Sequence, residues 1–167
     1  MNDTPSHPVS LTWPAPNPEL AAAVMGSIMA GQGLCEVSDS QPWSAIERGT
    51  EFDRCAHWIA DALRSASLTA EEVRAGVVGG WFHLWSGNDV DGAMVSEIIA
   101  SPRLRAIHVF AAGGSLGAIA KLTPDIEQFA RMAGCNFGGA SGRKGWIRFL
   151  RRFGYAPPAL ATVEKAL

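Results

Sequence analysis

Two ionisable side chains lie inside apolar segments that read as strands. His108 alternates with Ile107 and Val109 and therefore points to the opposite face of its strand, where an imidazole can act as a base within a cleft. Glu97, inside the apolar run "MVSEII", is a second candidate base. The alternatives are a hydrogen-bonded structural histidine and a solvated glutamate on the outer face of the sheet.

Three glycines follow the strand that carries His108. The segment "FAAGGSLGAIAKL" places Gly113, Gly114 and Gly117 between an apolar run and a new helix-like pattern. Backbone amides and a helix N-terminus at such a junction can hold a phosphate group. A plain strand-to-helix turn is the alternative, because glycine supplies unusual backbone angles in either case.

Helices are expected to dominate the first half of the chain, where apolar residues recur at three and four positions. They are predicted over residues 17–31, 50–66 and 68–80. The third begins where Thr69 and Glu72 have the spacing of a capping box.

The pattern changes to alternation after residue 80. Three strand-like runs separated by turn segments predict an antiparallel meander over residues 80–87, 92–100 and 104–112. Together with the elements that follow, the order is helices, three strands, helix, strand, helix, strand. This order predicts an α+β fold with a mixed sheet.

Four elements are expected beyond the strand of His108. Thr123 as cap and Pro124 in the first position predict a helix that begins there and ends at Gly134. The remaining elements are a short strand, a helix and a final strand, over residues 135–141, 145–154 and 159–167.

The second half resembles the acetyl-CoA-dependent N-acetyltransferase superfamily, the GNAT fold. The segments "AIHVFAAGG", "ARMAGC" and "GWIRFLRRFGY" carry the resemblance, and they are most similar to the small GNAT-like proteins of tailed bacteriophages. The similarity covers residues 68–167. Residues 1–20 are then a proline-rich arm and residues 21–67 a helical elaboration of a single globular domain.

The resemblance implies a cofactor site. In the GNAT fold two neighbouring parallel strands splay apart and receive the pantetheine arm of acetyl-CoA. Here Val109 and Phe110 would face that arm, and Gly113, Gly114 and Gly117 would form the pyrophosphate loop. His108 or Glu97 would then deprotonate an amine acceptor of a protein or a small molecule.

Two departures from the family pattern bear on catalysis. The glycine loop lacks the leading basic or amide residue, and Leu150 stands where many active members have a tyrosine that protonates the departing thiolate. Tyr155, the single tyrosine, follows Gly154. Two functions therefore compete: a catalytically degenerate phage protein that serves as a virion or assembly component, and an active acetyl-CoA-dependent N-acetyltransferase.

Charged and aromatic side chains suggest contacts with other subunits. Arg148, Arg151 and Arg152 share one helical face, which is either a solvated face, a contact for an acidic protein surface or nucleic acid, or a grip on the 3′-phosphate of CoA. The six tryptophans are either packed in the core or anchor an interface with another subunit. They stand at positions 13, 43, 58, 81, 85 and 146. The proline-rich arm is a third candidate for such a contact.

The totals describe an ordinary single domain. The chain has 167 residues and a formal net charge of −2, so its net charge does not indicate a particular class of binding partner. The three cysteines lack metal-ligand spacing, the pair Cys55 and His57 is too sparse for zinc, and no Ser/His/Asp constellation stands out. Without a bilayer-length apolar run or a signal-peptide pattern, we expect a cytoplasmic protein without membrane insertion.

Overall fold

The computed structural model describes residues 9–12, 34–35, 43–64, 66–101, 104–143 and 145–156. The predicted helix over 17–31 and the predicted strand over 159–167 lie outside these ranges, and only residues 9–12 of the arm lie within them. The described elements form a mixed sheet with helices on both faces, so the α+β class is confirmed. No described helix is long and apolar enough to cross a membrane.

The sheet has the order β1-β6-β5-β4-β2, and β3 pairs with β4 beside β2. The predicted meander is confirmed, because β3–β4 and β4–β5 are antiparallel; β5 and β6 run parallel, and β1 lies antiparallel to β6. The strands are β1 (Val9–Thr12), β2 (Leu34–Cys35), β3 (Phe82–Trp85), β4 (Gly92–Ser101), β5 (Leu104–Gly114) and β6 (Phe137–Gly142).

Helices α2 (Ala45–Leu63) and α3 (Ala70–Val78) both begin at capping boxes. The box of Thr69 and Glu72 confirms the predicted start of α3. Helix α2 begins five residues before the predicted position, because Ser44 caps it and exchanges hydrogen bonds with the residue at its third position. The apolar stripes of the two helices pack against the same face of the sheet.

The predicted start of the next helix is wrong. Helix α4 (Leu116–Met132) begins at the cap Ser115, and Pro124 lies inside it. The Thr123 hydroxyl donates to the carbonyl of Ile119 instead of capping a helix. Each large apolar side chain that the added turns bury contributes about 1.5–3 kcal/mol. Two such residues offset the roughly 3 kcal/mol that an interior proline costs.

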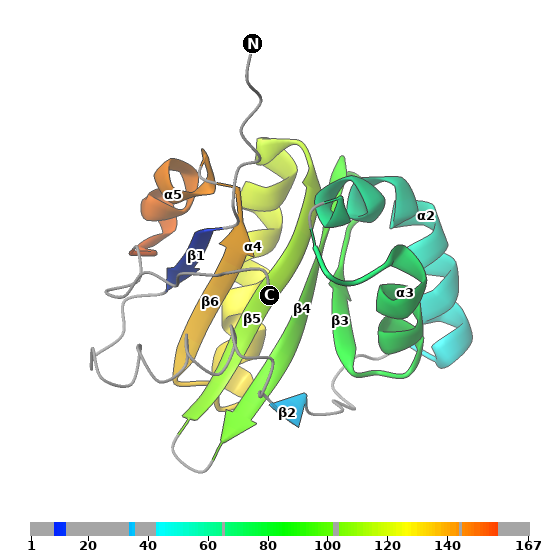
Figure 1. Cartoon of the computed structure of the whole chain (residues 1–167), viewed down its shortest axis with the longest axis horizontal. Helices are drawn as coiled ribbons and strands as arrows, with labels where there is room; N and C mark the ends of the chain where they lie inside the picture. Colours follow the sequence, from blue (N-terminus) through cyan, green and yellow to red (C-terminus); the bar gives the residue numbers. More distant parts are fainter. Residues whose placement is uncertain are drawn as a thin grey trace, which may run out of the picture.

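Two apolar cores cover the two faces of the sheet. Helix α4 lies behind the sheet and packs on one face, while α2 and α3 lie beside β3 and cover part of the other (Figure 1). Helix α5 (Gly145–Leu150) adds to the α4 core and continues into the 3₁₀ turn η1 (Arg151–Phe153). Gly154 ends this segment with φ +84°, as the sequence predicted.

Candidate functional site

Three polar side chains from adjacent strands meet on the sheet face opposite α4. Glu97 of β4 pairs with His108 of β5, and His108 in turn lies opposite Gly139 of β6, two residues before Ser141. The apolar neighbours of these three residues along the strands belong to the core under α4; they are Ile98, Ile107, Val109 and Ala140. By strand alternation the three polar side chains therefore share the other face.

These side chains form a continuous hydrogen-bonded chain. The Nδ1 atom of His108 lies 3.1 Å from Oε1 of Glu97, and its Nε2 atom lies 2.8 Å from Oγ of Ser141. A carboxylate only accepts, so for a neutral imidazole this geometry places the proton on Nδ1 and leaves Nε2 to accept from the serine hydroxyl. His108 is 5% exposed, whereas Glu97 and Ser141 are half-buried. The two contacts hold the imidazole ring in one orientation.

Strands β5 and β6 separate next to this chain. Their parallel pairing runs from Ala106 opposite Phe137 to Val109 opposite Ala140 and ends there. Both strands nevertheless continue, β5 to Gly114 and β6 to Gly142. At the same level a bulge leaves Phe110 without an opposing residue on β4. The facing edges beyond this point carry backbone groups that the parallel ladder does not use.

The glycine segment forms a short strand-to-helix turn, the alternative to a pyrophosphate loop. Gly113 and Gly114 are the last residues of β5, and Ser115 alone joins them to α4. An added Cβ at Gly113 would lie 2.0 Å from the carbonyl oxygen of Trp58, and one at Gly114 would lie 2.2 Å from that of Asp91. Both glycines are needed for close backbone packing.

The start of α4 is the exposed part of this junction. Ser115 caps the helix by accepting from the amide of Ala118, and Leu116 is 59% exposed. A Cβ at Gly117 would meet only the hydroxyl of Ser115, at 3.8 Å. Because β5 and β6 are parallel, this helix start lies at the same end of the sheet as their separated ends.

The side chains of Val109 and Phe110 point into two different cores. Val109 is buried under α4. Phe110 is half-buried on the other face, where its ring lies 4.9 Å from that of Phe82. At the separation of the strands these two residues therefore offer mainly their backbone.

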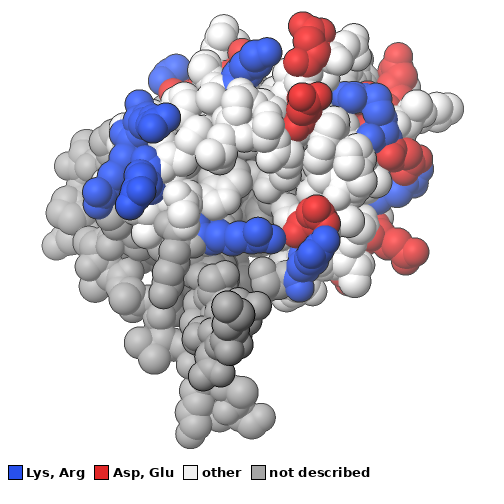
Figure 2. All heavy atoms as spheres, turned by 90° about the horizontal axis from the view of Figure 1, so that it is seen from above, with Lys and Arg blue, Asp and Glu red and all other residues white. Residues whose placement is uncertain are grey.

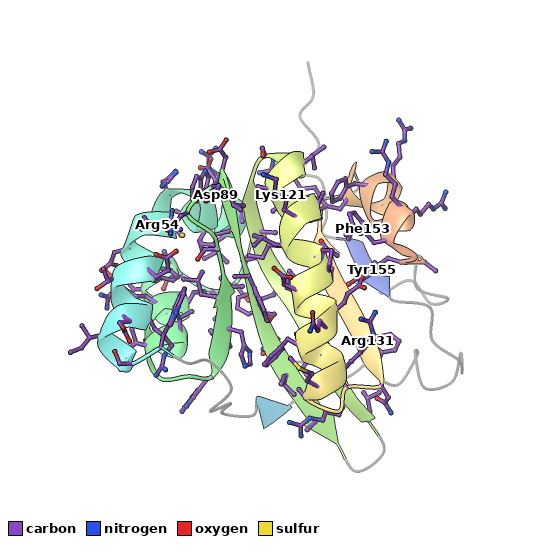
Figure 3. The ribbon with its side chains drawn as sticks, turned by 180° about the vertical axis from the view of Figure 1, so that it is seen from behind. Arg54, Asp89, Lys121, Arg131, Phe153 and Tyr155 are labelled. Carbon is purple, nitrogen blue, oxygen red and sulfur yellow. The ribbon has the colours of Figure 1, made fainter. Side chains whose placement is uncertain are left out.

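Leu150 and Tyr155 both lie in the core under α4. From behind, Tyr155 is seen beside α4, on the side where α5 lies (Figure 3). Burial raises the pKa of its hydroxyl, and the charge of Glu127 acts in the same direction. The sheet lies between Tyr155 and His108, so the tyrosine is not part of the polar chain.

The arginines of α5 and η1 form an exposed surface. Arg148, Arg151 and Arg152 are exposed, as is Arg143 just before α5, and none of the four has an ion pair with a described residue. Viewed from above, basic side chains gather on the side of the molecule where α5 lies (Figure 2). We call these four residues the arginine surface.

The tryptophans divide between cores and surface. Trp43 is 36% exposed and Trp81 is 55% exposed, while Trp13 lies outside the described residues. Three others pack half-buried against the two cores: Trp58, Trp85 and Trp146.

Sequence reasoning found two members of the polar chain and missed the third. His108 and Glu97 are brought together, but Ser141 is 33 residues from His108 and joins it only through the parallel pairing of β5 and β6. No local motif marks such a serine. Among the described residues no group of three His, Cys, Asp or Glu side chains could hold a metal ion.

No protein-family model and no curated protein matches this chain. A buried imidazole between a carboxylate and a hydroxyl, beside two separating strands, is an arrangement suited to proton transfer.

Proposed function

We propose that the chain is a GNAT-like protein that binds an acyl-CoA thioester, acetyl-CoA in the first instance, between β5 and β6 and transfers its acyl group to an amine. The observation that carries this proposal is the end of the parallel ladder at Val109 and Ala140, beside the chain of Glu97, His108 and Ser141. The resemblance of residues 68–167 to the GNAT superfamily supports the same assignment.

The separated strands suit the pantetheine arm. That arm carries two amides, and backbone groups of β5 and β6 are suitable partners where the pairing of the two strands ends, at Val109 and Ala140. The exposed start of α4 suits the pyrophosphate, since the first amides of a helix attract anions and Gly117 permits close approach.

Glu97 and His108 supply the base in this proposal. The carboxylate orients the imidazole and stabilises the positive charge that the ring gains when it accepts a proton. The acyl acceptor is an amine, and its nitrogen must lose a proton during attack on the thioester carbonyl.

Isothermal titration with acetyl-CoA tests the proposal. We expect binding that Gly117→Trp weakens at least tenfold, because the indole would fill the space in front of the first turn of α4. Gly114 is unsuitable for this test, since its φ is +105° and its Cβ would overlap the backbone of Asp91. Met132→Trp, at the other end of α4 and 73% exposed, is the matched control. Absence of binding at millimolar acetyl-CoA would overturn the proposal.

A second candidate is a phage protein that has lost catalysis and serves as a virion or assembly component. Leu150 in the position of the family tyrosine and the one-residue connection between β5 and α4 favour it. The arginine surface would then contact an acidic protein surface or nucleic acid. For this function we expect no heat with acetyl-CoA, and co-sedimentation with purified particles that is lost when Arg151 and Arg152 are changed to glutamate.

A further inference from the structure

Both ring nitrogens of His108 are engaged. Nδ1 faces the carboxylate of Glu97, and Nε2, the nitrogen that can accept a proton, lies 2.8 Å from the hydroxyl of Ser141. The first proton within reach of this base therefore belongs to Ser141. A hydroxyl bonded to an imidazole that a carboxylate orients is the arrangement that activates serine as a nucleophile.

The position of Ser141 fits this role. It directly follows Ala140, the last residue of β6 that pairs with β5, so it lies where the strands begin to separate. Its residue is half-buried, whereas His108 is 5% exposed. The nucleophile is thus more accessible than its base, and three adjacent strands fix the geometry of the chain.

We propose that Ser141 is a covalent nucleophile that carries the acyl group as an ester before the amine receives it. The identity of the donor as an acyl-CoA rests on the proposed function; the nucleophile itself does not. In the first half-reaction, His108 therefore accepts the proton of Ser141 and not that of the amine.

The steps balance without a further reactant. Oγ of Ser141 forms a bond to the thioester carbonyl carbon while its proton passes to Nε2 of His108. The carbon–sulfur bond then breaks, and the thiolate takes the proton from His108. In the second half, the amine nitrogen attacks the ester carbon and passes its proton to His108, which returns one to Oγ of Ser141 as the carbon–oxygen bond breaks.

The test uses acyl and phosphonyl donors without CoA, so that its failure is distinguishable from failure of CoA binding. The full chain is incubated with a fluorophosphonate and, separately, with p-nitrophenyl acetate, and the modified residue is located by peptide mass spectrometry. We expect modification at Ser141, lost in Ser141→Ala and at least a hundredfold slower in His108→Gln. Glu97→Gln should slow it about tenfold or more.

Ser86→Ala is the matched control. The hydroxyl of Ser86 donates directly to the carboxylate of Glu51, with no imidazole between them, so its loss should leave the labelling rate unchanged. If His108→Gln fails to fold, Ser141→Cys keeps the proposal testable, since a thiol in the same place should be alkylated faster than Cys55, which is buried with a pKa raised by burial.

Three outcomes decide the matter. Modification of Ser141 without acetyl-CoA binding would support the nucleophile and remove CoA as the acyl source. Binding of acetyl-CoA without modification of Ser141 by either reagent would overturn the acyl-serine and leave direct transfer to the amine. Labelling spread over several serines, unaffected by His108→Gln, would also overturn it.

Discussion

At the scale of single residues, the two buried histidines of the sheet differ in what surrounds them. His108 has a polar partner on each ring nitrogen. His83 is 1% exposed and packs against the rings of Trp85 and Phe129, and neither of its ring nitrogens has a well-formed hydrogen bond with a described residue. Burial lowers the pKa of His83 to about 4, and the backbone of Ser96 offsets only part of this shift. His108 is therefore held by polar contacts and His83 mainly by aromatic packing.

The lowered pKa of His83 predicts a loss of stability in mild acid. Between pH 6.5 and about 4 the unfolded chain binds a proton at this residue and the folded chain does not, so the free energy of unfolding falls as pH falls. From pH 7 to pH 5 we expect a contribution of about 2 kcal/mol to this loss. Urea unfolding at several pH values measures it.

His83→Phe is the comparison for that measurement. The aromatic ring keeps contact with Phe129 but takes up no proton. Its free energy of unfolding should fall less between pH 7 and pH 5 than that of the unchanged protein. Equal slopes for the two proteins would show that His83 is not the group responsible.

At the scale of elements, the glycines at the junction of β5 and α4 differ in how tightly they are packed. Gly113 and Gly114 leave no room for a side chain, whereas Gly117 does. We expect Gly113→Ala to lower the free energy of unfolding by about 1–3 kcal/mol, because its Cβ would overlap the backbone of Trp58. Gly117→Ala, in open space at the start of α4, should leave stability unchanged or raise it by up to about 1 kcal/mol. Denaturant unfolding of both variants tests the contrast; similar losses would contradict it.

Pro124 lowers the stability of α4, because it interrupts the hydrogen bonding inside the helix. It is exposed inside the helix and lacks the amide that would donate to the carbonyl four residues before it. We expect Pro124→Ala to raise the free energy of unfolding by about 1–2 kcal/mol. Gln128→Ala, exposed on the same helix, is the control, and differential scanning calorimetry measures both. A lower melting temperature for Pro124→Ala would mean that the proline supports the packing of α4.

The element scale also explains what the sequence could and could not predict. The capping box at Thr69 and the alternation of β3, β4 and β5 are local patterns, so the sequence predicts them correctly. Proline is favoured in the first turn of a helix, so the sequence predicts a helix start at Pro124, whereas burial of the apolar stripe before it extends α4 to Leu116. Ser141 could not be found, because its contact with His108 depends on which strands become neighbours.

At the scale of the whole molecule, charge is strongly divided. Residues 43–97 contain nine acidic and four basic residues, whereas residues 128–156 contain six basic and no acidic ones. Although the net charge of the chain is only −2, one region is strongly basic, and it includes the arginine surface. This division is visible in the sequence, but the location of the arginines on one side of the molecule required the fold.

The arginine surface should retain the protein on a cation-exchange column despite its net negative charge. We expect the unchanged protein to bind at low salt at pH 7.5 and Arg151→Glu/Arg152→Glu to pass through, because the bound surface loses its charge. Arg64→Glu/Arg74→Glu changes the net charge equally but removes arginines that pair with Asp61 and Asp53. If both double variants elute alike, retention depends on net charge and not on this surface.

The pairing of β1 with β6 has a consequence for the order of folding. Val9 lies opposite Gly142 in this ladder, so about 130 residues separate two partners in the chain. During synthesis from the N-terminus, β1 emerges long before β6, so this pairing cannot form until β6 has been made. Closing so long a loop adds entropy cost to each pair formed, and we infer that this edge of the sheet is completed late, after the local meander of β3, β4 and β5.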